Sequence, residues 1–164
     1  MDDPGVVVRR CTSLDWQQLK AIRLESLGDT PEAYGSTYDD AATWPDDRWR
    51  SAASQWTYWL AERHGRVVGM VSGGANDHHP GTRWMYGMYV TPAERGTDVA
   101  TRLVDEVCQW ARGESANSLF LNVTSTVARA RAFYEKVGFE LTGEVNAMDR
   151  DPSLHLETMV RELG

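Results

Sequence analysis

Two stretches of the sequence carry residue types that could do chemistry together. The first is the loop from Arg95 to Thr101, which follows an apolar run ending at Val90 and precedes an amphipathic segment. Backbone N–H groups at a helix N-terminus attract anions, and a small residue such as Gly96 lets a ligand approach the backbone. This stretch therefore predicts a phosphate-binding loop. The alternative is a plain turn in which Thr97 caps the following helix.

The second stretch is a helical pattern from Thr126 to Val137, followed by Gly138. Helical spacing puts Tyr134 on the same face as Ala130. A phenol with an ordinary pKa of ~10 stays protonated at neutral pH, so one interpretation of Tyr134 is a residue with a proton to donate. The alternative is an ordinary core aromatic whose hydroxyl reaches the surface.

Strands and helices must position these two stretches. Apolar periodicity and turn residues predict strands at about 6–10, 57–62, 67–71, 83–90, 119–123, 139–142 and 154–160, and helices at about 13–27, 44–55, 98–112 and 126–137. Ser13 is the predicted N-cap of the first helix, and Gly113 is the predicted C-terminal glycine of the third. The order of elements predicts a single α/β (α+β) domain over residues 1–164, with a mixed sheet.

The loop resembles the acetyl-CoA loop of the GNAT superfamily of N-acetyltransferases, whose pattern is Arg/Gln-x-x-Gly-x-Gly/Ala. Arg95, Val99 and Ala100 fit this pattern, and Gly96 is the extra glycine commonly seen after the arginine. The second stretch resembles the family phrase Asn-x-x-Ala-x-x-Φ-Tyr-x-x-x-Gly-Phe, where Φ is apolar. The order of elements also resembles the GNAT fold, over essentially the whole chain.

The resemblance implies a GNAT-like fold, with a mostly antiparallel central sheet and helices on both faces. It implies an enzyme that moves an acetyl group from acetyl-CoA to a primary amine of a small molecule or peptide, by direct attack on the thioester and without a metal. The residues expected to bind acetyl-CoA are Met88, Tyr89, Val90, Arg95, Gly96, Thr97, Asp98, Val99, Ala100, Thr101, Val127 and Ala130. Tyr134 is expected to protonate the leaving thiolate. The resemblance also suggests a homodimer.

Two positions depart from the family pattern. Asp98 stands where the first motif glycine is expected, and Val127 where the family often has Asn. A carboxylate about 6 Å from a phosphate charge costs roughly 0.7 kcal/mol in water and about 3 kcal/mol at an effective dielectric of 20. Acetyl-CoA binding is therefore expected to be weakened roughly three- to hundredfold, not abolished. Arg102, one turn further on, could pair with Asp98.

The base that would deprotonate the amine is not evident in the sequence. The segment from Trp84 to Val90 contains no Glu, Asp or His. Glu25 is the candidate assigned as a catalytic residue, and Glu32, His78 and His79 are further candidates. For each of them the alternative is a solvated surface residue without a catalytic role. A chain of water molecules is a further possibility.

Composition excludes some classes of function. The 164 residues are 41% hydrophobic and 25% charged, as expected of one globular domain, and the formal net charge of −7 argues against nonspecific nucleic-acid binding. No apolar run reaches membrane-spanning length, the start of the sequence lacks a signal-peptide pattern, and Cys11 and Cys108 fit no zinc spacing. The expectation is a cytoplasmic protein with no nucleic-acid or membrane partner.

Two other functions remain open. One is a non-catalytic acyl-CoA-binding regulatory module, and the other is an interaction protein without a cofactor. Acetyl-CoA binding separates the last of these from the first two, and thiol release in the presence of amines separates catalysis from binding alone.

Overall fold

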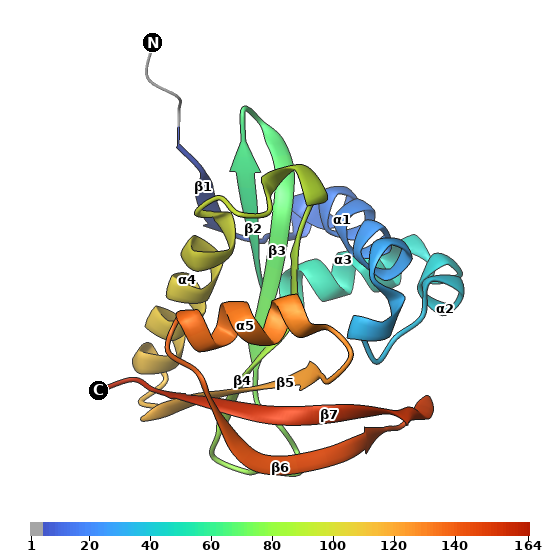
Figure 1. Ribbon diagram of the computed structural model, residues 1–164. Coiled ribbons are helices and arrows are strands. Elements are labelled where there is room, and N and C mark those ends of the chain that lie inside the picture. The colour runs from blue at the N-terminus through green and yellow to red at the C-terminus, as the bar shows by residue number, and fades with distance from the viewer. Residues whose placement is uncertain (1–4) are drawn as a thin grey trace.

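A computed structural model describes residues 5–164, which form a seven-stranded sheet with helices on both faces (Figure 1). The expectation that the chain begins without a signal peptide rests on Met1 to Pro4, which lie outside these residues. The strands are β1 (Val7–Arg10), β2 (Thr57–Arg63), β3 (Arg66–Gly74), β4 (Arg83–Val90), β5 (Ser118–Thr124), β6 (Glu140–Met148) and β7 (Asp151–Glu162), and their spatial order is β1-β2-β3-β4-β5-β7-β6. Among these strands β4 and β5 pair parallel and all other neighbours pair antiparallel. The predicted mixed, mostly antiparallel sheet is confirmed.

The helices agree with the sequence in place but differ in detail. They are α1 (Trp16–Asp29), α2 (Tyr38–Ala42), α3 (Asp46–Gln55), α4 (Val99–Gly113) and α5 (Ala128–Lys136), with short 3-10 turns η1 (Ser13–Asp15), η2 (Pro31–Ala33) and η3 (Pro92–Glu94). The predicted Ser13 cap is wrong, because Thr12 caps η1 through a capping box with Asp15. Helix α2 was not predicted. No helix within residues 5–164 is long and apolar enough to cross a membrane.

Each face of the sheet has its own hydrophobic core. Side chains alternate along β2, so Trp59 and Ala61 pack toward α4 while Leu60 packs toward α1 and α3. The apolar face of α4 is buried at Val99, Leu103, Val104, Val107 and Ala111, and Trp110 beside it is half-buried. In Figure 1, α4 lies on one side of the sheet and α1 and α3 on the other.

The C-terminus of α4 differs from the prediction. Gly113 is the last helical residue and does not take the left-handed conformation; Ser115 does, with φ of 63°. The N–H of Ala116 donates to the carbonyl of Ala111 and that of Ser115 to the carbonyl of Arg112, both at 2.9 Å. This is the hydrogen-bond pattern in which glycine usually occupies the position of Ser115.

Strands β4 and β5 separate soon after they pair. Their register contains only the pairs Arg83–Leu119 and Trp84–Phe120. On its other edge, β4 has one extra residue relative to β3, at a bulge where Gly87 has φ of 62°. The remainder of β4 therefore has an edge that faces an opening in the sheet instead of a neighbouring strand.

Candidate active site

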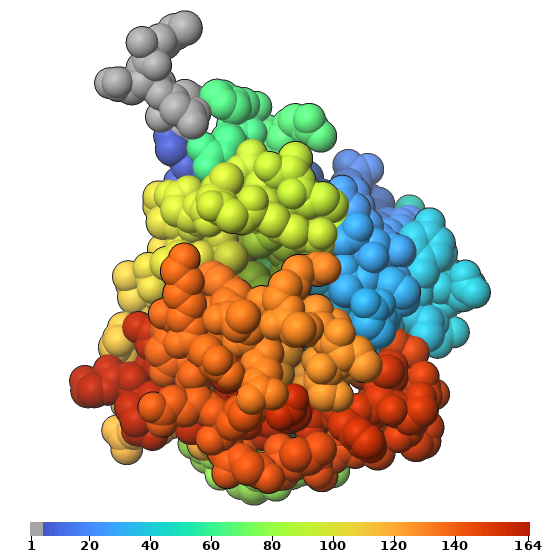
Figure 2. All heavy atoms as spheres, in the orientation of Figure 1, coloured from blue at the N-terminus to red at the C-terminus, as the bar shows by residue number. Residues whose placement is uncertain are grey.

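A cavity of about 470 Å³, here cavity 1, lies where β4 and β5 diverge. Its walls come from β4, η2, the β4–α4 loop, the start of α4, and α5. Figure 2 shows the recess between the yellow-green residues of the β4–α4 loop and the orange residues of α5. The predicted cofactor residues that line it are Met88, Tyr89, Val90, Arg95, Gly96, Thr97, Ala100, Thr101, Val127 and Ala130, together with Tyr134. The fold thus brings both predicted stretches to one cavity.

The β4–α4 loop has unused hydrogen-bond donors. Within residues 5–164, the N–H groups of Gly96, Asp98, Ala100 and Thr101 donate to no acceptor, whereas the next N–H, of Arg102, donates to the carbonyl of Asp98 at 3.0 Å. A Cβ added at Gly96 would meet no atom within 4 Å, so the space beside its backbone is open. Four N–H groups without acceptors at a helix N-terminus fit a phosphate or diphosphate group.

Three cationic side chains line cavity 1. The guanidinium of Arg95 is 2.5 Å from the carboxylate of Asp29, at the end of α1, and this contact holds the pKa of Asp29 below its usual range. Arg129 donates to the hydroxyl of Thr30 at 3.2 Å. The third is Lys136, at the end of α5. These charges would add to the attraction of the loop for an anion.

Asp98 and Val99 are the two predicted cofactor residues that do not line cavity 1. Val99 is completely buried against the sheet. The carboxylate of Asp98 lies 3.4 Å from the guanidinium of Arg63 and 4.0 Å from that of Arg102, so the predicted pairing with Arg102 is present. The backbone of Asp98 has φ of −81°, which any residue can adopt.

Tyr134 lies between cavity 1 and a second, adjoining cavity of about 280 Å³, here cavity 2. Its ring packs against Phe133 and Phe139, with centroid distances of 5.5 and 5.8 Å. Its hydroxyl makes no hydrogen bond to any of residues 5–164. Burial raises the pKa of the Tyr134 phenol, and the neighbouring Tyr34 adds to this, so the group is protonated across the physiological range.

Val127, in the position where the family often has Asn, is buried and precedes α5. Its side chain makes no capping hydrogen bond, and its N–H donates to the carbonyl of Thr124 at 3.0 Å. Val127 and Ala130 line both cavities. The position therefore contributes an apolar wall in place of an amide.

The candidate bases, which include Glu32 of η2, line neither of these two cavities. Glu25 is exposed on α1 and lines neither cavity; its carboxylate lies near the phenol of Tyr89, whose pKa is raised first by burial and then by Glu25. His78 and His79 line a third cavity of about 510 Å³, and the Nε2 of His79 is 3.9 Å from Glu144. Within residues 5–164, no three His, Cys, Asp or Glu side chains gather as a metal site. The assignment of Glu25 as a catalytic residue stays a prediction.

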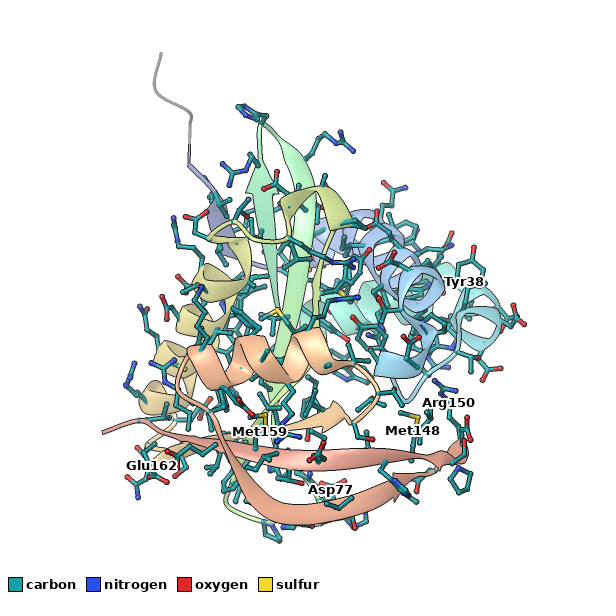
Figure 3. The ribbon with its side chains drawn as sticks, viewed as in Figure 1. Tyr38, Asp77, Met148, Arg150, Met159 and Glu162 are labelled. Carbon is teal, nitrogen blue, oxygen red and sulfur yellow. The ribbon has the colours of Figure 1, made fainter. Side chains whose placement is uncertain are left out.

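Tyr34 was not predicted as a site residue, although it lines cavities 1 and 2. Its hydroxyl donates to the carbonyl of Met88 at 2.9 Å, and burial raises its pKa to about 12. Arg150, between β6 and β7, donates to the carbonyls of Tyr34 and Pro31 at 3.0 and 2.5 Å. Figure 3 shows Arg150 at the end of that hairpin, beside the segment that follows α1. No local pattern signals these contacts, which join residues more than 50 positions apart.

Comparison with known proteins gives a family match. Residues 16–139 match the model of the "Acetyltransferase (GNAT) family". Curated relatives include the mouse "Probable N-acetyltransferase family 8 member 5" (Mus musculus), 33% identical over 91 residues, and human N-acetyltransferase 8 (Homo sapiens), 31% identical over 91 residues. The matches cover 54% and 53% of this chain and 40% of each relative, so the chain spans about two fifths of the length of these relatives.

Solved structures of the same fold cover nearly the whole chain. The acetyltransferase of the GNAT family from Streptococcus pneumoniae superposes with a TM-score of 0.75 at 16% identity, over 98% of this chain and 100% of that one. The protein yncA from Salmonella typhimurium, solved with its cofactor acetyl-CoA, gives a TM-score of 0.76 at 20% identity, over 98% and 95% of the two chains. At these identities the likeness establishes the fold.

Proposed function

The chain belongs to the acetyltransferase (GNAT) family, and we propose that it transfers the acetyl group of acetyl-CoA to a primary amine of a small molecule or peptide. One observation carries this proposal: cavity 1 is lined both by N–H groups that donate to no residue within 5–164 and by Tyr134, whose hydroxyl bonds to none of them. An anion-binding group and a proton donor in one cavity are what an acyl-CoA transferase needs.

The residues of cavity 1 fit acetyl-CoA. The N–H groups from Gly96 to Thr101 would hold the diphosphate, and Arg95, Arg129 and Lys136 would add positive charge around it. The unpaired edge of β4 would hold the pantetheine arm as a neighbouring strand would. Acetyl-CoA bound there supplies a thioester, whose carbonyl carbon is attacked by the amine nitrogen as the C–S bond breaks.

Tyr134 would act on the departing sulfur. Its raised pKa keeps the proton on the phenol until negative charge develops on the thiolate. The same raised pKa makes the deprotonated tyrosine unfavourable, so the phenol must regain a proton as it donates its own to the sulfur. The attacking nitrogen loses one proton and the thiolate gains one, so the exchange balances once a path links the two.

Water is the best-supported path for the proton of the amine. In the described part of the chain, no Asp, Glu or His side chain lines cavity 2, and the only one that lines cavity 1 is Glu94, which pairs with Arg63 at 3.1 Å. A buried amine has a lowered pKa and needs only modest help to lose a proton. Glu25 could act only through intervening groups, because it lines neither cavity.

The proposal has two measurable parts. Acetyl-CoA at a hundred times its Kd is expected to stabilise the protein by about 2.7 kcal/mol in a thermal-shift titration. Thiol release with a panel of primary amines is expected to be catalytic. Stabilisation without thiol release for any amine would favour the non-catalytic acyl-CoA-binding module, and no stabilisation would exclude both.

Tyr134→Phe tests the assigned acid. We expect kcat to fall roughly 10²-fold, within the range usual for a positioned general acid, with the Kd of acetyl-CoA changed less than threefold. Tyr38→Phe is the matched control, because Tyr38 is exposed on α2 and lines none of the three cavities (Figure 3). Equal kcat values for the two variants would remove Tyr134 from this role.

A further inference from the structure

Cavity 2 continues from cavity 1 on the other side of Tyr134. The two share Ala33, Tyr34, Met88, Val127, Ala130 and Tyr134 as lining residues. The remaining wall of cavity 2 is mixed: Met85, Leu121, Val123 and Leu156 are apolar, whereas Arg23, Asn122 and Thr124 are polar. An amine acceptor that enters cavity 2 would therefore reach the reacting end of cavity 1.

Among residues 5–164, the only ionisable charge that lines cavity 2 is the guanidinium of Arg23, from α1. It lies over the ring of Tyr34, 5.1 Å from the centroid, and about 3.5 Å from where a Cβ on Gly87 would stand. It makes no hydrogen bond or ion pair to any group within residues 5–164. By contrast, Arg9 and Arg95 each contact a carboxylate. A guanidinium at a cavity, with no anion beside it, favours a ligand that carries one.

A second polar group, buried beside cavity 2, also lacks a partner within residues 5–164. Thr124, the last residue of β5, is 2% exposed, and its hydroxyl oxygen is buried without a hydrogen bond to any described residue. A buried hydroxyl without a partner is costly unless a ligand or water satisfies it. Thr124 and Arg23 come from different elements, so the two observations are independent.

We propose that cavity 2 binds a free amino acid as the acetyl acceptor, with its carboxylate on Arg23. A guanidinium matches a carboxylate through two parallel N–H···O bonds. The amino nitrogen then faces Tyr134 and the hydroxyl of Thr124, and an aliphatic or thioether side chain contacts the apolar wall. This inference rests on the proposed function and selects its small-molecule branch, because a peptide N-terminus has an uncharged carbonyl where the amino acid has a carboxylate.

The reaction balances with the residues already described. The lone pair of the neutral amine forms the N–C bond to the acetyl carbon, and the C–S bond breaks. Tyr134 gives its proton to the sulfur, and the nitrogen releases one proton through water to restore the phenol. The products are the N-acetylamino acid and free thiol.

The substrate test compares acceptors that differ only in the carboxylate. Leucine, leucinamide and 3-methylbutylamine share a side chain, and only leucine carries the negative charge. We expect kcat/KM for leucine to exceed that for leucinamide by roughly 10- to 100-fold, the range for a hydrogen bond to a charged group. The comparison is repeated with the other free amino acids and their amides.

The variant test assigns the preference to Arg23. Arg23→Gln is expected to raise KM for the preferred amino acid roughly 10- to 100-fold and KM for its amide less than threefold, and Arg23→Lys to lie between. Arg48→Gln is the matched control: Arg48 also lies over an aromatic ring, 3.6 Å from the centroid of Trp44, but lines none of the three cavities. Thr124→Val is expected to lower kcat/KM for every amine, and Thr124→Ser to retain it.

The outcomes separate this inference from the function beneath it. The inference is overturned, and the acetyltransferase proposal stands, if amines are acetylated but no free amino acid has a higher kcat/KM than its amide. The same holds if Arg23→Gln raises KM equally for the amino acid and its amide. If acetyl-CoA binds and no amine of any class is acetylated, the proposed function fails and the inference fails with it.

Discussion

At the scale of single residues, the carboxylate of Asp98 shows how a departure from the family pattern is accommodated. Its side chain lies beside Arg63 and Arg102, outside the lining of cavity 1, while its N–H remains without an acceptor. The two guanidinium groups partly neutralise the charge of Asp98 and so reduce its repulsion of a phosphate. The weakening of acetyl-CoA binding should therefore lie at the lower end of the three- to hundredfold range expected from the sequence.

Asp98→Asn tests this reasoning. Removal of the charge is expected to tighten acetyl-CoA binding by less than about threefold, measured by calorimetry, because the carboxylate lies beside two guanidinium groups and does not line cavity 1. Arg95→Gln provides the comparison, since Arg95 lines cavity 1 and its loss should weaken binding. A tightening of tenfold or more in Asp98→Asn would mean that the carboxylate acts on the diphosphate directly.

At the scale of elements, the close approach of α4 to β3 decides where the loop stands. Two glycines of β3 face the helix: a Cβ at Gly69 would lie 3.0 Å from a methyl carbon of Leu103, and one at Gly73 would lie 2.7 Å from the ring of Trp110. That ring also packs edge-on against Trp59, at 6.0 Å between centroids, so it cannot move freely. Larger residues at either position would push α4, and the loop before it, away from β4.

Gly73→Ala is expected to destabilise the protein by about 1–3 kcal/mol, the usual cost of overpacking, as measured by urea unfolding. Gly113→Ala is the matched control: a Cβ there meets nothing within 4 Å and the residue is helical, so stability should be unchanged or increase by up to about 1 kcal/mol. Equal unfolding midpoints for the two variants would contradict the packing account.

At the scale of the whole molecule, arginines join elements that are distant in sequence. Arg95, Arg129 and Arg150 contact the segment from Asp29 to Tyr34 from three different parts of the chain, and this segment is a shared wall of cavities 1 and 2. The site therefore depends on contacts that form only when the domain is assembled.

The ion pair between Arg9 and Asp15 predicts how the free energy of unfolding depends on pH. Asp15 accepts from Arg9, which also pairs with Glu62 of β2, and the pKa of Asp15 is lowered to about 2, chiefly by that hydrogen bond. The folded pKa lies below the unfolded value of ~3.9, so the stabilisation is complete above about pH 5 and is lost as pH falls toward 2. Its size is on the order of 2.5 kcal/mol.

Asp15→Asn should therefore lower the free energy of unfolding by about 1–3 kcal/mol at pH 7, and the gap to the unsubstituted protein should shrink by pH 3. Urea unfolding at several pH values measures both. Asp39→Asn, at an exposed position of α2, should show no such dependence. A gap that stays constant from pH 7 to pH 3 would rule out the ionic origin of this stabilisation.

The sequence by itself determined the elements whose pattern is local. Strand β4 spans Arg83–Val90 as predicted, and the apolar face of α4 follows from the 3.6-residue period of the apolar residues in its sequence. The phosphate-binding loop was predicted from a helix start after a strand, and Tyr134 from a short phrase that resembles the family pattern; the roles of both stay predictions. Short α2 lacked enough turns to show a period.

Only the tertiary structure decided what those elements enclose. Arg23, Tyr34 and Thr124 lie on α1, on the segment after it and on β5, and none belongs to a periodic pattern that singles it out. They meet because β4 and β5 pair at two positions and then diverge, which opens a cavity that helices from both ends of the chain close. Local spacing predicts the faces of elements, whereas the partners of a side chain depend on long-range packing.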